Sequence, residues 1–139
     1  MEMVARAHCD VPCGIYETDT MNHAVDTCRK LVKKMLDSSN SFNVQQASPK
    51  ERAEYLNFMA RSVHVKDEYA QICKRELLIL WTDWFKEEHL KKWPDLHAKI
   101  WKATKLCSEV KRSVDADKVE QLQKAVDEVA KIFAESKKA

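Results

Sequence analysis

A single glycine is the feature that most limits what this chain of 139 residues can fold into. With only three prolines beside it, the chain has few of the residues that form the tight turns between β-strands. A third of the residues are charged and 45% are hydrophobic, which is typical of long amphipathic helices. The length suits one domain whose core needs no disulfide or structural metal. We therefore expect an all-α protein with a single core.

Two helices are expected in the first half of the chain, where apolar residues recur three and four positions apart. The first begins near Asp19, with a polar side chain to cap it, and ends at about Asp37. Residues 38–47 are rich in Ser, Asn and Gln and indicate a loop. The second helix starts at residues 48–51, Ser-Pro-Lys-Glu, a capping box with proline at the first helical position, and continues through Trp84.

Two more helices are expected in the second half. A polar connector at residues 86–93 precedes a helix that opens at Pro94 and ends near Arg112. The last helix starts near Asp115 and has the clearest amphipathic stripe of the chain. Four helices with short connections most simply form an antiparallel four-helix bundle. The apolar positions of the third helix are Leu96, Ile100, Trp101, Leu106 and Val110, and those of the fourth are Val119, Leu122, Val126, Val129 and Phe133.

The charge balance argues against nucleic-acid and membrane partners. The chain has 24 basic and 22 acidic residues, a net charge of +2, so no strong field of one sign is expected. No apolar run approaches the roughly 18 residues of a spanning helix, and residues 1–7 lack the apolar stretch of a secretory signal. We expect a cytoplasmic protein.

The five cysteines fall into two groups. An odd number of cysteines cannot all be paired, and a reducing compartment keeps cysteines as thiols. A disulfide framework is therefore disfavoured. Cys28, Cys73 and Cys107 lie within helical patterns and are expected to be buried structural thiols. Cys9 and Cys13 lie instead in the short segment that holds the only glycine and one of the prolines, which is where chemistry is expected.

This segment has the donors of a metal site. His8, Cys9 and Cys13 supply an imidazole and two thiols within six positions, while Pro12 and Gly14 allow a sharp chain reversal around one ion. The cysteines are separated by three residues and no second Cys or His pair follows nearby. This differs from the paired elements of zinc modules, so structural zinc is disfavoured.

Residues 8–16, His-Cys-x-x-Pro-Cys-Gly-x-Tyr, closely resemble the nickel-binding hook of nickel superoxide dismutases. Residues 80–86, 93–97 and 131–139 are also similar to that family. The resemblance implies an oxidoreductase that disproportionates superoxide to hydrogen peroxide and dioxygen by one-electron cycling between Ni²⁺ and Ni³⁺. It also implies a homohexamer of four-helix bundles.

The resemblance further implies the nickel ligands. These are the α-amine of His8, the amide nitrogen of Cys9 and the thiolates of Cys9 and Cys13, with the His8 imidazole axial in the oxidised state. Tyr16 would order water or peroxide beside the metal with its phenol; its alternative role is packing. Because the His8 amine is blocked by Ala7, we expect a protease to remove residues 1–7 as a leader. Residues 8–16 are then the hook and residues 17–139 the bundle domain.

Three positions depart from the family pattern. Trp84 stands where the family has a tyrosine, and an indole donates a hydrogen bond but accepts none. Ala24 and Tyr69 stand where the family places a carboxylate and an arginine behind the axial histidine, so His8 must be held differently, for example through Tyr69. Lys86 is, from its family position, the best candidate to attract superoxide.

Two other functions remain open from the sequence. A helical nickel- or copper-binding protein for storage or delivery would use the same hook without turnover, and copper competes for such a site. A thiol-redox enzyme that uses Cys9 and Cys13 is a third possibility. The remaining histidines each lie alone on a helix or connector and are assigned no role; they are His23, His64, His89 and His97.

Overall fold

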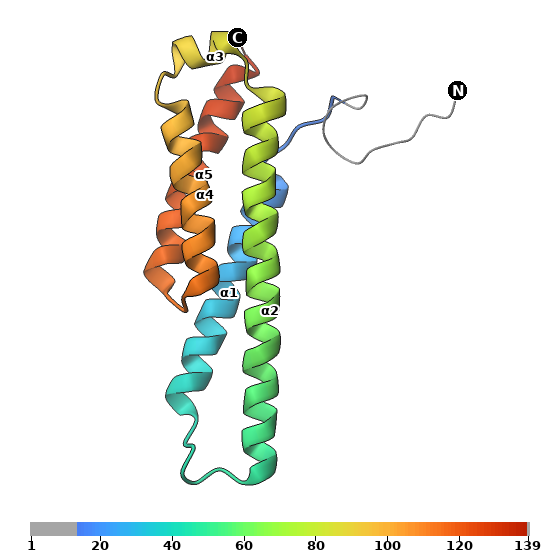
Figure 1. Cartoon of the computed structure of the whole chain (residues 1–139), viewed down its shortest axis with the longest axis vertical. Helices are drawn as coiled ribbons and strands as arrows, with labels where there is room; N and C mark the ends of the chain where they lie inside the picture. The colour runs from blue at the N-terminus through green and yellow to red at the C-terminus, as the bar shows by residue number, and fades with distance from the viewer. Residues whose placement is uncertain (1–13, 139) are drawn as a thin grey trace, which may run out of the picture.

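The structure is a computed structural model that describes residues 14–138. Within them, four long helices form a bundle and one short helix crosses an end of it (Figure 1). Around the bundle, α1 packs against α2 and α5, and α4 packs against the same two helices. The predicted all-α four-helix bundle is confirmed. The elements are α1 (Asp19–Ser41), α2 (Pro49–Ile79), the π-helical turn η1 (Leu80–Trp84), α3 (Glu87–Lys92), α4 (Leu96–Arg112) and α5 (Ala116–Ser136).

The first connection is shorter than predicted, because α1 runs past Asp37 to Ser41. Phe42 then leaves the helix with an extended backbone, and its ring stacks on that of Tyr55 in α2, with centroids 4.0 Å apart and planes at 4°. This contact between the two helices decides where α1 ends. Ser48 and Glu51 form both hydrogen bonds of the predicted capping box at the start of α2.

The prediction that residues 86–93 form a connector was wrong in part, since these residues contain the short helix α3. The backbone N–H of Lys86 donates to Nδ1 of His89 at 2.9 Å, which caps the start of this short helix. Basic side chains in its last turn complement the helix dipole. A histidine acting as the cap partner is not one of the usual sequence signals for a helix start, so the element was missed.

The core runs between the four long helices and contains the predicted stripes of α1, α4 and α5. One prediction was wrong: Trp101 is 64% exposed and lies outside the core. The buried side of α4 follows Leu96, Ile100, Ala103 and Cys107, all at most 1% exposed. Position 101 falls beside this stripe, so its indole faces outward. None of the described helices is long and apolar enough to cross a membrane.

Lys66 is a charged residue within this core, only 1% exposed. Its ammonium donates to the carbonyl oxygens of Val110 and Lys111 at 2.5 and 2.6 Å, and to the Asp67 carboxylate at 3.1 Å. Val110 and Lys111 lie in the last turn of α4, where carbonyl groups have no donor within the helix. Lys66 therefore caps α4 from α2 and places a positive charge at the negative end of the helix dipole.

We predict that Lys66→Met lowers the free energy of unfolding by about 2–4 kcal/mol, because two carbonyl groups at the helix end lose a charged donor. Urea denaturation measures the change. The exposed Lys124→Met in α5 is the control and should shift stability by less than about 0.5 kcal/mol. Equal stability of the two variants would contradict the capping role of Lys66.

The three helical cysteines are fully buried and free, as predicted. Burial raises the pKa of Cys28 from 9.0 to about 11, although Lys66 acts in the opposite direction. The pKa of Cys73 is also raised, by a hydrogen bond with Cys107 and by burial. Because the thiolate is the reactive form, these thiols are protected from oxidation at neutral pH.

The raised pKa of Cys28 predicts a loss of stability in alkali. An unfolded thiol ionises near pH 9 whereas the folded one holds its proton to about pH 11, so unfolding releases a proton between these values and becomes easier as the pH rises. This contribution amounts to about 2–3 kcal/mol. Denaturation at pH 8 and pH 11 should show that the free energy of unfolding falls less between these pH values for Cys28→Ala than for the parent chain. Parallel pH profiles would contradict this assignment.

Candidate metal centre and its anchor

The predicted metal ligands His8, Cys9 and Cys13 lie outside the described residues, so their roles stay predictions. The described part of the motif begins at Gly14, whose φ of 63° is the left-handed conformation that glycine adopts at little cost. A residue with a Cβ would be strained there. This agrees with the predicted chain reversal next to Cys13.

Tyr16, the last residue of the motif, packs against the bundle. Its half-buried ring lies 5.3 Å from that of Trp84, centroid to centroid, at a tilt of 54°. Trp84 in turn meets Phe133 of α5 edge to face, at 5.2 Å and 69°. Rings from the start of the chain, the end of α2 and the end of α5 thus form one cluster. We call Tyr16, Trp84, Phe133, Ser136 and Lys137 the anchor cluster.

The π-helical turn η1 places Trp84 in this cluster. The wider turn ends when the N–H of Phe85 bonds to the carbonyl oxygen of Leu80, five residues earlier, at 3.0 Å. Such turns change which way the following side chains face and are frequent at functional sites. The Trp84 indole N–H donates to the Ser136 hydroxyl at 2.9 Å. The single donor of the Trp84 side chain is therefore used inside the bundle.

Two polar groups at the end of α5 complete the anchor cluster. Ser136, 4% exposed, donates its hydroxyl to the carbonyl oxygen of Phe133 at 2.6 Å while it accepts from Trp84. The Lys137 ammonium lies 4.4 Å from the centroid of the Phe133 ring and donates to the carbonyl oxygen of Tyr16 at 3.3 Å.

Sequence reasoning missed both of these residues. They lie about 120 positions after Tyr16, and no local pattern connects them to it. One signal was present for Ser136: it takes the next position of the apolar stripe of α5, after Val129 and Phe133, yet carries a hydroxyl. A small polar residue on a buried stripe indicates a specific hydrogen bond.

His89 also has contacts that the sequence did not predict. Its ring stacks parallel to that of Trp84, with centroids 6.5 Å apart and planes at 6°, and meets Phe85 edge to face at 5.8 Å. Its Nδ1 accepts the Lys86 N–H. His89 thereby connects the start of α3 with the anchor cluster. The Lys86 side chain is exposed at this start.

The two positions expected behind the axial histidine lie on facing helices. Ala24 is fully buried in α1 and offers no polar side chain. Tyr69 is half-buried in α2 and meets the His23 ring edge to face, with centroids 5.9 Å apart. At the positions where the resemblance predicts a carboxylate and an arginine, the structure thus has a methyl group and an aromatic pair.

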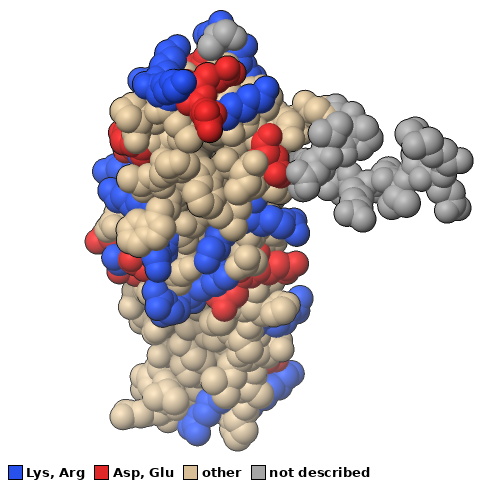
Figure 2. Space-filling model, turned by 45° about the horizontal axis from the view of Figure 1, so that its top comes forward, with Lys and Arg blue, Asp and Glu red and all other residues tan. Residues whose placement is uncertain are grey.

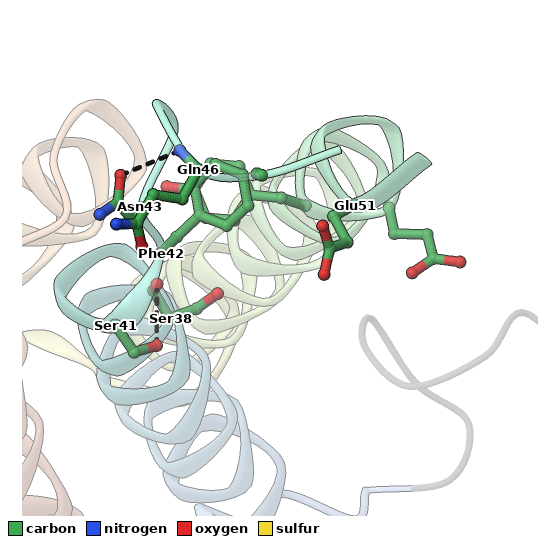
Figure 3. Close-up of a pocket in the computed structure, with 9 residues that line it drawn as sticks. Ser38, Ser41, Phe42, Asn43, Gln46 and Glu51 are labelled. Carbon is green, nitrogen blue, oxygen red and sulfur yellow. Dashed lines mark hydrogen bonds between the residues drawn. The ribbon is translucent and has the colours of Figure 1, made fainter. Parts of the chain in front are cut away.

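Among the described residues, no group of three or more His, Cys, Asp or Glu side chains is arranged to hold a metal ion. A pocket of about 430 Å³ lies between the end of α1 and the start of α2, lined by residues that include Ser38, Phe42 and Glu51 (Figure 3). It is at the opposite end of the bundle from α3 and the C-terminus (Figure 1). We do not assign it to the metal centre.

Charges of both signs gather at the end of the bundle that holds α3 and the C-terminus (Figure 2). The first turn of α3 carries Glu87 and Glu88, and the last carries Lys91 and Lys92. The surface near Lys86 is thus mixed in charge. Any attraction of an anion here would come from individual lysines and would be short-ranged at physiological salt.

Residues 3–137 match the sequence profile of a family described as nickel-containing superoxide dismutase. The chain belongs to the nickel-containing superoxide dismutase family. Within this family it is 29% identical, over 133 residues, to the superoxide dismutase [Ni] of Streptomyces seoulensis, a match covering 96% of this chain and 90% of that protein. It is 27% identical over 138 residues to that of Streptomyces coelicolor, covering 99% and 94%.

Solved structures of nickel-containing superoxide dismutases have the same fold. A crystal structure with the nickel ligation of the oxidised state superposes with a TM-score of 0.80 at 30% identity, over 95% of this chain and all of that chain. A native structure gives a TM-score of 0.78 at 29% identity, with the same coverage.

Family membership confirms the predicted fold, enzyme class, superoxide dismutase function and nickel cofactor. It favours the enzyme over the storage or delivery protein and over the thiol-redox enzyme. The donor set also fits nickel, because thiolate and nitrogen ligands stabilise its higher oxidation state.

Proposed function

We propose that this nickel superoxide dismutase builds its metal site from residues 8–16 once residues 1–7 have been removed. His8 would contribute its new α-amine and its imidazole, Cys9 its amide nitrogen and thiolate, and Cys13 its thiolate. The nine-residue motif is the observation that carries this proposal. The left-handed Gly14 and the packing of Tyr16 on Trp84 support it, because they turn the chain beside Cys13 and fasten the end of the motif to the bundle.

Superoxide dismutation needs a centre that takes one electron from one superoxide ion and gives it to a second. Bound nickel supplies that exchange: one superoxide loses an electron and leaves as dioxygen, and a second gains an electron and two protons and leaves as hydrogen peroxide. Nickel binding would keep the thiols of Cys9 and Cys13 deprotonated, and oxidation of these thiolates to sulfinic acid by the peroxide product would destroy the site. Tyr16 would order water or peroxide through its phenol.

Removal of the leader would act as a maturation switch. The His8 nitrogen in the uncleaved chain is a peptide amide, a far poorer ligand than an amine. A free α-amine has a pKa of about 8 and loses its proton to a metal near neutral pH. The precursor would thus carry both thiols but lack one nitrogen ligand, and a protease would complete the set.

We predict that the chain starting at His8 binds nickel and consumes superoxide, whereas the full chain has at most about one hundredth of that activity, because it lacks the amine ligand. Metal analysis and pulse radiolysis measure the two properties. A chain starting at Ala7, with one extra residue before His8, is the matched control and should behave like the full chain.

Three results would contradict this proposal. Equal activity of the full and cleaved chains would show that the amine is not a ligand. Equal activity of the chain that starts at Ala7 would show the same. Tight nickel binding by the cleaved chain without superoxide consumption would support the alternative of a storage or delivery protein.

We also propose that the enzyme acts in the cytoplasm as a homo-oligomer, a hexamer by its resemblance to the family. A face formed by α2, η1 and α4 supports self-association: Leu78, Trp81 and Trp101 are 37%, 37% and 64% exposed there. They line a largely apolar hollow of about 460 Å³. Large exposed aromatic residues are enriched where protein surfaces meet. A second copy of the chain is the occupant we propose.

We predict that Trp101→Lys dissociates the oligomer, because it places a charge on this apolar face. Sedimentation velocity measures the assembly state. Val44→Lys is the matched control: it introduces the same charge at an apolar residue that is 60% exposed in the α1–α2 connection, and it should leave assembly unchanged. A monomeric parent chain, or dissociation by both variants, would contradict this interface.

A further inference from the structure

We infer that the end of α5 positions the metal-binding segment: Ser136, through the Trp84 indole, and Lys137, through the Tyr16 carbonyl group, hold the last residue of the motif in place. This inference rests on the proposed site at residues 8–16 and adds positioning residues to it. It follows from the anchor cluster, in which Ser136 accepts from the Trp84 indole, Lys137 donates to the Tyr16 carbonyl oxygen, and the rings of Tyr16 and Trp84 pack on each other.

Ser136 acts on the orientation of the Trp84 ring. An indole has one donor and no acceptor, and its donor here meets a hydroxyl that is itself fixed by the Phe133 carbonyl oxygen. Because the Ser136 proton is committed to that carbonyl, the lone pairs of its oxygen are left to accept from Trp84. The ring against which Tyr16 packs is therefore fixed by a hydrogen bond as well as by its contacts with Phe133 and His89.

Lys137 acts on the backbone of Tyr16. Its side chain crosses the Phe133 ring, with the ammonium 4.4 Å from the ring centroid, before it reaches the Tyr16 carbonyl oxygen. The ring contact reduces the freedom of a long side chain that would otherwise lose much entropy on forming one exposed hydrogen bond. Tyr16 is thus held at two points, its ring and its carbonyl group.

Two points of attachment fix direction as well as position. A ring contact alone would let the chain before Tyr16 pivot about the side-chain bonds. A hydrogen bond to the carbonyl group also sets the plane of the following peptide. Tyr16 lies three positions after Cys13, so the direction of the chain at Tyr16 limits where the thiol can lie. Binding a metal to a segment held in advance costs less ordering entropy.

The experiment compares Lys137→Met, which keeps an aliphatic side chain over Phe133 but removes the donor, with Lys138→Met as the matched control. The first readout is hydrogen exchange of the peptide containing residues 14–20 in the nickel-free chain, which depends on neither nickel nor catalysis. The second is the nickel dissociation constant of the chain starting at His8, from competition with a chelator.

We expect Lys137→Met to speed exchange of this peptide and to raise the nickel dissociation constant, each by about 5-fold, the equivalent of one net hydrogen bond. Lys138→Met should change neither. Unchanged exchange in Lys137→Met, or an equal change in Lys138→Met, would overturn the inference. If the cleaved chain binds no nickel, the proposed site fails, but the exchange result still decides whether Lys137 holds Tyr16.

The role of Ser136 is tested by a double-mutant cycle with Trp84. Ser136→Ala should speed exchange of the same peptide in the parent chain but have no further effect in Trp84→Phe, which lacks the indole N–H. Additive effects of the two substitutions would show that Ser136 acts by another route and would overturn its part of the inference. Thermal melts followed by circular dichroism identify variants that exchange faster only because they are globally unstable.

Discussion

The packing of Trp84 between Tyr16 and Phe133 is the contact on which the arrangement of this protein depends. It joins the start of the chain, the end of α2 and the end of α5, which are otherwise far apart in the sequence. Each partner is set in turn by local structure: η1 places Trp84, and the regular stripe of α5 places Phe133 and Ser136. A rigid bundle can thus support a short metal-binding segment through Tyr16, the last residue of the motif.

This arrangement separates two kinds of cysteine in one enzyme that produces peroxide. The thiols of Cys28 and Cys73 hold their protons because burial raises the pKa of Cys28, and a hydrogen bond with Cys107 together with burial raises the pKa of Cys73. All three cysteines are shielded from solvent. Cys9 and Cys13 must be thiolates to bind nickel in the proposed site. Burial thus keeps the structural thiols of the bundle unreactive, and in the proposed site the nickel chemistry would fall to Cys9 and Cys13.

The sequence predicted the fold well where periodicity and capping act locally, as in the capping box at Ser48 and the stripe of α5. It was wrong where a contact between helices decided the outcome: Phe42 extends α1 by stacking on Tyr55, and Trp101 faces outward beside a buried stripe. The motif at residues 8–16 could be recognised in the sequence because its predicted donors, His8, Cys9 and Cys13, lie within six positions of one another. Ser136, Lys137 and His89 could not be recognised in this way. The partners of Ser136 and Lys137 are distant in sequence, and His89 takes part in a helix cap that no common pattern describes.

The ligands themselves are most directly measured by nickel K-edge X-ray absorption on the chain that starts at His8. If that chain binds nickel as proposed, the spectrum shows two sulfur neighbours together with nitrogen neighbours, and Cys9→Ser or Cys13→Ser each removes one sulfur. The full chain, which lacks the amine, gives a different spectrum. Nitrogen and oxygen neighbours alone, or a sulfur count that neither substitution changes, would contradict a nickel site built from His8, Cys9 and Cys13.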